Sequence, residues 1–349
     1  MRANLAAKRA ASRARHLLYR EIRAYFADAG FDEVETPLLV PAPGMEPHVD
    51  CFETTFVPEM GAAGPERTMW LHGSPEFAMK RLLADGYERI FQITKVFRNG
   101  EIATHHNPEF TMLEFYRAIG AEDERAGRGY GPILIDLEEL GARGAVAIAG
   151  SERIRVGGAG IDLTPPWDRL TVEEAFATRA GIELPMDGDA ELLLARARER
   201  GYDPPPSCTS FDDVFFSIFL TMIEPSLGWS RPVFLVDWPA SMAALAKIRS
   251  DDHRVAERFE LYVAGRELAN GYHELNDAAE QRRRLIAEQE LRRALGKTVY
   301  PLDESFIEAV GRMPPAAGVA VGVDRLLMLL GGWDSIADVL LFPAAEELA

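Results

Sequence analysis

The hydrophobic pattern predicts two β-strands joined by a polar loop in the first third of the chain. Residues 91–98 are rich in β-branched and aromatic side chains, which favour a buried strand. Asn, Gly and Pro in the following residues indicate a loop. In residues 109–117 a period of two places Thr111, Leu113 and Phe115 on one face, which we expect to be core. The other face carries Phe110, Met112, Glu114 and Tyr116.

The polar face of the second strand has the groups that a cationic amine requires. Glu114 and Tyr116 can both accept hydrogen bonds from an amine, and the carboxylate neutralises its charge. Arg98, at the base of the loop, can bind a phosphate or a carboxylate through two parallel hydrogen bonds. The alternative is an ordinary amphipathic hairpin with solvated charges.

A second polar hairpin is predicted in residues 259–277, with its turn at Ala264-Gly265. A two-residue turn pairs Tyr262 with Glu267 and places Glu260 diagonally from Glu267 on the same face. Two such carboxylates repel unless a cation joins them, and Mg²⁺ takes oxygen ligands that it commonly shares with phosphates. The alternative is an acidic hairpin that faces solvent.

Further elements follow from periodicity and capping. Apolar residues at 17, 18, 22 and 26 predict an amphipathic helix that ends at Gly30, followed by a short strand in residues 31–37. Seven basic residues within residues 1–23 leave a transit peptide as the alternative. Ser74 and Pro75 predict the start of another helix, where the helix dipole favours Glu76.

The patterns in the remaining segments predict their secondary structure only in outline. Residues 118–160, rich in Gly and Ala, are predicted to be a loop-rich insertion with one strand at residues 133–135. Residues 211–223 predict an apolar helix whose Phe residues pack in the core, with a ligand site as the alternative. Residues 318–330 predict a strand followed by a helix. We expect residues 1–349 to form a single catalytic domain.

Composition narrows the class of protein. The 349 residues have 47% hydrophobic and 27% charged content, typical of a globular domain, and no apolar run reaches the roughly 18 residues of a membrane span. With 38 basic against 55 acidic residues the net charge is -17, which opposes binding to nucleic acid. The two cysteines, Cys51 and Cys208, are far apart, which favours a reducing, cytoplasmic setting.

Residues 97–99 (FRN) and 106–116 (HNPEFTMLEFY) resemble motif 2 of the class II aminoacyl-tRNA synthetases, in the lysyl branch. The resemblance implies that Arg98 holds the α-phosphate and the amino acid carboxylate, that His106 contacts the terminal phosphates and that Phe110 stacks on adenine. Glu114 and Tyr116 would bind the side-chain amine. It further implies ATP contacts from Glu101 and Asn107. The family usually has Glu two places after the motif arginine, where this chain has Gly100.

Other segments resemble the same family. Residues 1–37 resemble motif 1, which implies a homodimer; a helix and strand packed within one monomer is the alternative. Residues 318–330 resemble motif 3, which implies that Arg325 lies over adenine. Arg98 and Arg325 would be the catalytic residues. The resemblance assigns further residues to ligands: Glu76, Asn270, Tyr272 and Glu274 to the amino acid, and Glu260 and Glu267 to Mg²⁺. Since strict alternation would turn Asn270, Tyr272 and Glu274 away from Glu267, we expect a β-bulge near Asn270-Gly271.

The resemblance implies an α+β fold, a class II synthetase-like antiparallel sheet flanked by helices. We expect no N-terminal anticodon-binding barrel. With the acidic balance and Ala320, where lysyl-tRNA synthetases carry Gly, the chain resembles the paralogous ligases that attach lysine or (R)-β-lysine to elongation factor P. ATP, Mg²⁺, one of these amino acids and elongation factor P are the expected ligands and partner, with tRNA and membranes unlikely. The alternatives are a truncated lysyl-tRNA synthetase and a non-catalytic regulatory paralogue.

Overall fold

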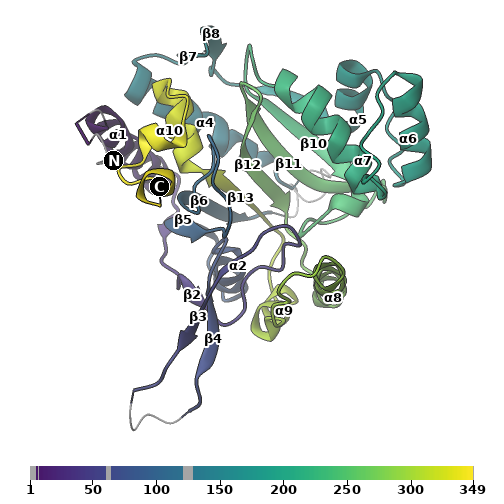
Figure 1. The fold of residues 1–349 in the computed structure, drawn as a ribbon. Helices are drawn as coiled ribbons and strands as arrows, with labels where there is room; N and C mark the ends of the chain where they lie inside the picture. The colour runs from purple at the N-terminus through teal and green to yellow at the C-terminus, as the bar shows by residue number, and fades with distance from the viewer. Residues whose placement is uncertain (1–4, 7, 60–63, 121–128, 349) are drawn as a thin grey trace.

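A computed structural model describes residues 5–6, 8–59, 64–120 and 129–348. Its centre is a sheet of eight strands (Figure 1). In sheet order the strands are β1 (Asp32–Glu33), β5 (Arg89–Phe97), β6 (Glu109–Ala118), β13 (Ala316–Gly322), β12 (Arg266–His273), β11 (Val255–Val263), β10 (Val233–Pro239) and β9 (Asp168–Thr171). Only the two edge strands, β1 and β9, pair in parallel with their neighbours. The predicted α+β fold with a mainly antiparallel sheet is confirmed.

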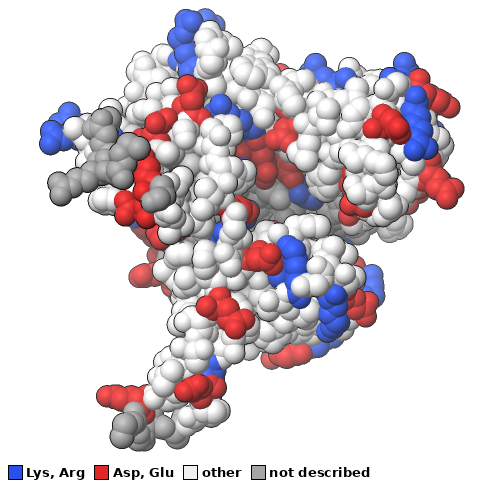
Figure 2. Space-filling view, in the orientation of Figure 1, with Lys and Arg blue, Asp and Glu red and all other residues white. Residues whose placement is uncertain are grey.

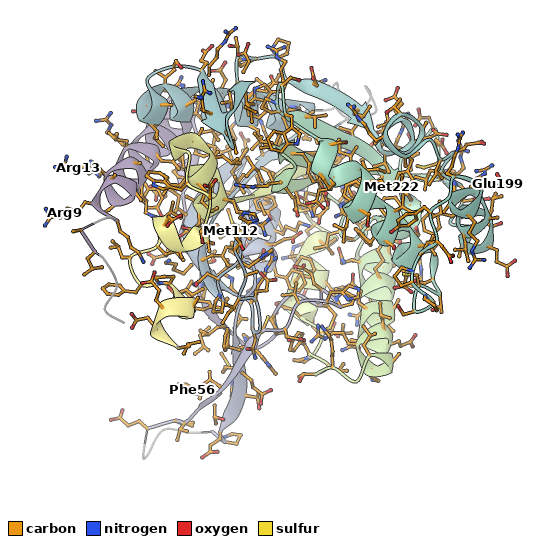
Figure 3. All side chains as sticks on the ribbon, turned by 45° about the horizontal axis from the view of Figure 1, so that its top comes forward. Arg9, Arg13, Phe56, Met112, Glu199 and Met222 are labelled. Atoms are coloured by element: carbon orange, nitrogen blue, oxygen red, sulfur yellow. The ribbon has the colours of Figure 1, made fainter. Side chains whose placement is uncertain are left out.

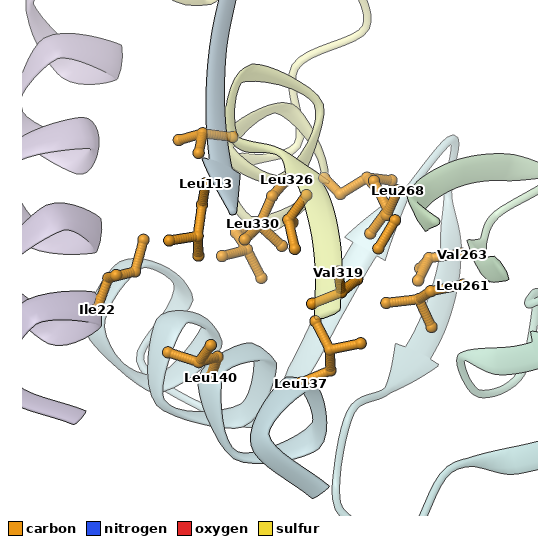
Figure 4. Close-up of a cluster of buried hydrophobic side chains, with 14 of the residues drawn as sticks. Ile22, Leu113, Leu137, Leu140, Leu261, Val263, Leu268, Val319, Leu326 and Leu330 are labelled. Carbon is orange, nitrogen blue, oxygen red and sulfur yellow. The ribbon is translucent and has the colours of Figure 1, made fainter. Parts of the chain in front are cut away.

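Helices α1 (Arg9–Asp28), α4 (Gly131–Ala149) and α10 (Val323–Gly331) cover one face of this sheet. Figure 4 shows the resulting core, in which Ile22 of α1, Leu140 of α4 and Leu330 of α10 pack against strand residues such as Leu113, Val319 and Leu261. The predicted amphipathic helix is therefore α1, and Gly30 follows it with a φ of 73° that favours glycine. Helix α1 packs in the main core, as predicted for an amphipathic helix of the domain.

A second core covers the β10 end of the sheet. Helices α5 (Val172–Ala175), α6 (Ala190–Glu199) and α7 (Phe211–Ile218) surround it, and a π-helical turn (Phe219–Ile223) continues α7. Phe211, Phe215 and Phe219 are buried here, as the apolar pattern predicts, whereas Phe216 is exposed, and Phe216 and Phe219 also line the cavity described below. Helix α5 begins with a capping box between Thr171 and Glu174.

The remaining elements lie around these two cores. Helix α2 (Glu76–Ala84) packs on α9 (Glu304–Val310), which packs on α8 (Ala278–Ala294). A small sheet of β2 (Leu39–Val40), β3 (Phe52–Phe56) and β4 (Arg67–Leu71) projects from the body (Figure 1). Strands β7 (Arg153–Val156) and β8 (Ala159–Asp162) form a hairpin, and α11 (Ile336–Val339) and α12 (Ala344–Glu347) close the described chain.

The predicted strand at residues 133–135 is wrong, because these residues belong to α4. Ile133, Leu137 and Leu140 bury one face of this helix. Its glycines are packing positions rather than loop signals: a Cβ on Gly141 would lie 2.5 Å from the Trp167 ring, and one on Gly144 would lie 2.9 Å from Leu330. Of the stretch predicted to be loop-rich, residues 131–149 are thus helical and residues 153–162 form the β7–β8 hairpin, while residues 121–128 lie outside the described residues.

The predicted hairpin turn at Ala264-Gly265 is confirmed, with positive φ at both residues (53° and 67°), as a type I′ turn requires. Tyr262 pairs with Glu267 as predicted. The next pair is Leu261 with Ala269, so Leu268 is the extra residue of a bulge. The sequence predicts this bulge near Asn270-Gly271; the position is wrong, because the chain inserts the residue directly after Glu267.

Among the described helices, none is both long enough and apolar enough to cross a membrane. Cys51 and Cys208 are both free thiols.

The buried carboxylate of Asp324 joins three elements of the main core. It accepts hydrogen bonds from Arg15 of α1, at 2.5 Å, and from the backbone N–H of Thr111 in β6, at 2.6 Å. We expect Asp324→Ala to lower the free energy of unfolding by about 3 kcal/mol, because it leaves a buried charge and a buried donor unpaired. Urea unfolding measures this loss. Asp203→Ala, which breaks the exposed pair of Asp203 with Arg198, is the control and should cost less than about 1 kcal/mol; equal losses would contradict the prediction.

Candidate active site

The face of the sheet opposite the main core lines a cavity of 480 Å³. Figure 2 shows acidic side chains around a hollow in the middle of the molecule. Met112 of β6, a residue that lines the cavity, lies near the middle of the molecule in Figure 3. Every residue that the sequence predicts for ATP, metal or amino acid lines this cavity: Glu76, Arg98, Glu101, His106, Asn107, Phe110, Glu114, Tyr116, Glu260, Glu267, Asn270, Tyr272, Glu274, Ala320 and Arg325.

Strand register brings these residues together from distant parts of the chain. One row of paired residues runs across four strands as Glu114, Ala320, Asn270 and Glu260. The next row runs as Tyr116, Gly318, Tyr272 and Arg258. Paired residues on neighbouring strands point to the same face, so each row presents its side chains to the cavity. The bulge at Leu268 keeps Glu267 on this face as well.

One end of the cavity contains the carboxylates of Glu114, Glu76 and Glu274, and we call it the amine end. Glu114 forms its first part. The hydroxyl of Ser74 donates to one carboxylate oxygen at 2.6 Å, and the hydroxyl of Tyr116 donates to the other at 2.8 Å. Burial raises the pKa of Glu114 to about 8, and repulsion by Glu76 adds to this effect. Glu114 forms no ion pair within 4 Å with any of the described residues. A cation that entered beside it would stabilise the ionised carboxylate.

Glu76 and Glu274 form the second part. Both carboxylates contact the ammonium of Lys80, at 2.6 Å and 2.5 Å, and the lysine side chain is completely buried. Burial raises the pKa of Glu274 to about 8, although Lys80 opposes the rise. Gly318 makes room for this group, because a Cβ there would lie 2.2 Å from the Tyr116 ring and 2.6 Å from Glu274.

Arg98 provides an anion-binding group at the other end. Its guanidinium lies 5.3 Å from the centre of the Phe110 ring and 3.7 Å from Glu101. Its buried Nε atom has no hydrogen-bond partner among the described residues. A buried cation with an unused donor is suited to a phosphate or carboxylate. Glu46, Glu101, Glu267 and Glu114 outweigh the effect of burial and raise the pKa of Arg98.

Arg325, at the start of α10, contacts the loop that follows Arg98. It donates to the backbone oxygens of His105 and Glu267, at 3.3 Å and 3.1 Å, and its Nη2 lies 2.6 Å from Nε2 of His106. Burial, with repulsion by Arg325, lowers the pKa of His106 to about 4, so this imidazole is neutral at pH 7. Asn107 uses both ends of its amide in contacts with the backbone of Glu109 and Ala344.

Glu260 and Glu267 were predicted to share Mg²⁺. Glu260 accepts hydrogen bonds from Arg258, at 2.5 Å, and from Tyr262, and burial raises its pKa to about 7 with a contribution from Glu267. Within the described ranges, no group of three or more His, Cys, Asp or Glu side chains could hold a metal. Two carboxylates are enough for a Mg²⁺ ion that binds together with a nucleotide, because phosphate oxygens and waters supply its other ligands at such sites.

Among the side chains that bond to the predicted residues, four were not predicted to have a role here: Ser74 as a partner of Glu114, Lys80, Arg258 and Tyr262. Two of them carry a sequence signal. Lys80 lies four residues after Glu76, the spacing of a helical ion pair. Arg258 shares the strand periodicity of Glu260. Its guanidinium lies 4.3 Å from the Trp238 ring centre, and its Nε donates to Asn270 at 3.3 Å.

Comparisons with known proteins agree with this geometry. A family model described as tRNA synthetases class II (D, K and N) matches residues 3–346. A lysine–tRNA ligase of Pelotomaculum thermopropionicum is 36% identical over 332 residues, which are 94% of this chain and 62% of that protein. A lysine–tRNA ligase of Thermosynechococcus vestitus is 36% identical over 336 residues, 95% of this chain and 62% of that protein. The chain therefore spans less than two thirds of the length of these two relatives.

An elongation factor P–(R)-β-lysine ligase of Salmonella paratyphi B is 38% identical over 324 residues, which are 92% of this chain and 91% of that protein. The family model and these relatives each cover most of the chain, and they agree with the mainly antiparallel sheet and with the motifs that line its open face. The chain belongs to the class II tRNA synthetases of the D, K and N group.

Proposed function

We propose that the protein is an ATP-dependent ligase that activates lysine or (R)-β-lysine as an aminoacyl-adenylate and transfers the aminoacyl group to a lysine of elongation factor P. One observation carries the first half of the proposal: a single cavity has an excess of carboxylates at one end and an arginine with an unused donor at the other. Glu76, Glu114 and Glu274 carry three negative charges when ionised, and Lys80 carries one positive charge. The two charges that remain match the two ammonium groups of a diamino acid.

The proposed reaction has two steps. An oxygen of the substrate carboxylate attacks the α-phosphorus of ATP, the new O–P bond forms, and pyrophosphate leaves. The acceptor amine then attacks the acyl carbon, so that an N–C bond forms, AMP leaves with the electrons of the C–O bond, and the amine gives up a proton to solvent. No protein nucleophile is required.

The residues of this chain act by position and charge. Arg98 holds the carboxylate and the α-phosphate and stabilises the negative charge that develops there. Arg325 and Phe110 bind the adenine. Mg²⁺, when bound by Glu260 and Glu267, would neutralise phosphate charge. Glu114 and Tyr116 bind one amine of the substrate, and Glu76 and Glu274 bind the other.

Three observations favour a protein acceptor over tRNA. The relative that acts on elongation factor P is matched over 91% of its length. The net charge of -17 disfavours a polyanionic acceptor. Ala320 lies in the same row as Glu114 and Asn270, where lysyl-tRNA synthetases carry glycine, and its methyl group narrows the cavity there. Charging of tRNA remains the second candidate, because lysine–tRNA ligases are similar to nearly the whole chain.

We also propose a homodimer. Helix α1, strands β3 to β5 and the last described residues line a largely apolar groove of 650 Å³. Phe342 in this groove is 62% exposed. An exposed apolar groove beside the segment that resembles motif 1 is suited to a second copy of the chain. Light scattering should give twice the mass of the chain, and Phe342→Ser should weaken the dimer; a monomer at micromolar concentration would contradict this.

Pyrophosphate exchange and acceptor labelling test the proposed activity. We expect exchange that depends on lysine or β-lysine, and transfer of labelled amino acid to purified elongation factor P but not to tRNA. Arg98→Ala should lower the exchange rate by about a hundredfold or more, because it removes a charged donor from the developing charge. Arg153→Ala, a change at an exposed arginine of β7, is the control. Absence of exchange would exclude a ligase, and labelling of tRNA alone would favour the second candidate.

Ala320→Gly should improve the use of α-lysine relative to β-lysine by about tenfold, because one methyl group in a tight pocket is worth about 1 to 3 kcal/mol in discrimination. The ratio of kcat/KM for the two isomers in the exchange assay measures the effect. Ala317→Gly is the matched control, since Ala317 is buried on the opposite face of β13. An unchanged ratio in Ala320→Gly, or an equal change in both variants, would contradict the assignment of Ala320.

A further inference from the structure

Lys80 is a buried charge that does not itself line the cavity. It lies in the second turn of α2 and its side chain is 0% exposed. Its ammonium is a hydrogen-bond donor to Glu76 at 2.6 Å and lies 2.5 Å from Glu274, and both partners line the cavity. Burial lowers the pKa of Lys80, but attraction by Glu274 and Glu76 outweighs it and raises the pKa above its ordinary value. Lys80 is therefore a permanent cation behind the amine end.

The other titratable groups around Lys80 are acidic or neutral. Glu76 lies on the same helix, Glu114 and Tyr116 come from β6, and Tyr272 and Glu274 come from β12 and the residues that follow it. Glu46, which also lines the cavity, interacts electrostatically with Glu288 of α8, and Glu288 interacts with Glu76 and with the cation of Arg284. Within the described part of the chain, Lys80 is the cation whose ion pairs hold Glu76 and Glu274.

We propose that Lys80 is a positioning and specificity-determining residue. Its ammonium is a counter-ion that leaves the amine end with two negative charges, the number that the two ammonium groups of a diamino acid neutralise. The inference rests on the proposed function. Without Lys80 the three carboxylates would carry three charges, one more than the substrate has ammonium groups. With Lys80, two charges remain, and Glu76 and Glu274 are held on either side of one fixed cation.

This role predicts an unusual outcome when the charges are removed one at a time. Glu274→Gln leaves Lys80 in place and reduces the excess to one negative charge, so binding of a substrate with two ammonium groups should weaken. Adding Lys80→Met to Glu274→Gln restores an excess of two. The double variant should therefore bind lysine better than Glu274→Gln alone, although it lacks one more residue.

The experiment measures kcat and KM for lysine and for ATP by pyrophosphate exchange in the wild type, both single variants and the double variant. We expect Glu274→Gln to raise KM for lysine about tenfold or more, the loss of one charge-assisted contact. KM for lysine in the double variant should be about threefold or more lower than in Glu274→Gln alone. Non-additive effects of this size are usual for residues in contact. KM for ATP should stay within about threefold, because the arginine end is unchanged. For Lys80→Met alone, KM for lysine should rise as the pH rises, because ionisation of Glu274 without its counter-ion takes the excess from two negative charges to three.

Controls separate the role of Lys80 from folding and from the proposed function. Lys95→Met removes a half-exposed lysine of β5 and should leave KM for lysine unchanged. Thermal unfolding of each variant identifies any loss of structure. A double variant that binds lysine no better than Glu274→Gln alone, or a pH dependence of KM that Lys80→Met leaves unchanged, would overturn the inference. If the wild type itself shows no lysine-dependent exchange, the proposed function fails instead.

Discussion

The hydrogen-bonded register of β6, β13, β12 and β11 is the constraint on which the rest of the molecule depends. It places Glu114, Ala320, Asn270 and Glu260 in one row, although they come from widely separated parts of the chain. Because side chains alternate along each strand, the same register sends Leu113, Val319 and Leu261 to the opposite face, under α1, α4 and α10. The core and the cavity therefore lie on opposite faces of the same strands. A shift of one residue in the register of a strand would exchange its core residues and its cavity residues.

The cavity concentrates charge where the cost of burial is high. Glu114, Glu260 and Glu274 are almost completely buried, and in each case burial is the largest cause of a raised pKa. Hydroxyl donors, Arg258 and Lys80 offset part of this cost, since a buried ion is tolerated only when it is paired or hydrogen-bonded. The large apolar core on the other face supplies the stability that permits such a site. The site is consequently arranged before any ligand arrives.

Periodicity was sufficient for the main strands and for the polar face of β6, because the faces of a strand follow from its own sequence. Most residues of the cavity were instead assigned by the resemblance to the synthetase motifs. Both failed where the answer depends on distant partners. The glycines of α4 resemble loop signals until Trp167 and Leu330 are seen to pack against them. The partner of Glu274 is Lys80, almost two hundred residues away in the chain, and no local pattern connects them. The bulge was expected from the need to bring Glu267 and Asn270 to one face, but its place depends on pairing with β11.

The extra residue at Leu268 also restricts how this hairpin can change in length. Between the turn at Gly265 and the pair Asn270–Glu260, β12 contains one residue more than the facing stretch of β11. Deletion of Leu268 would remove the bulge and leave Glu267 and Asn270 two positions apart, so that strict alternation would keep both on the cavity face. Deletion of two residues would instead leave β12 one residue short and turn Glu267 and Asn270 to opposite faces. Related chains that lack the bulge should therefore be shorter by one residue between Glu267 and Asn270, and not by two.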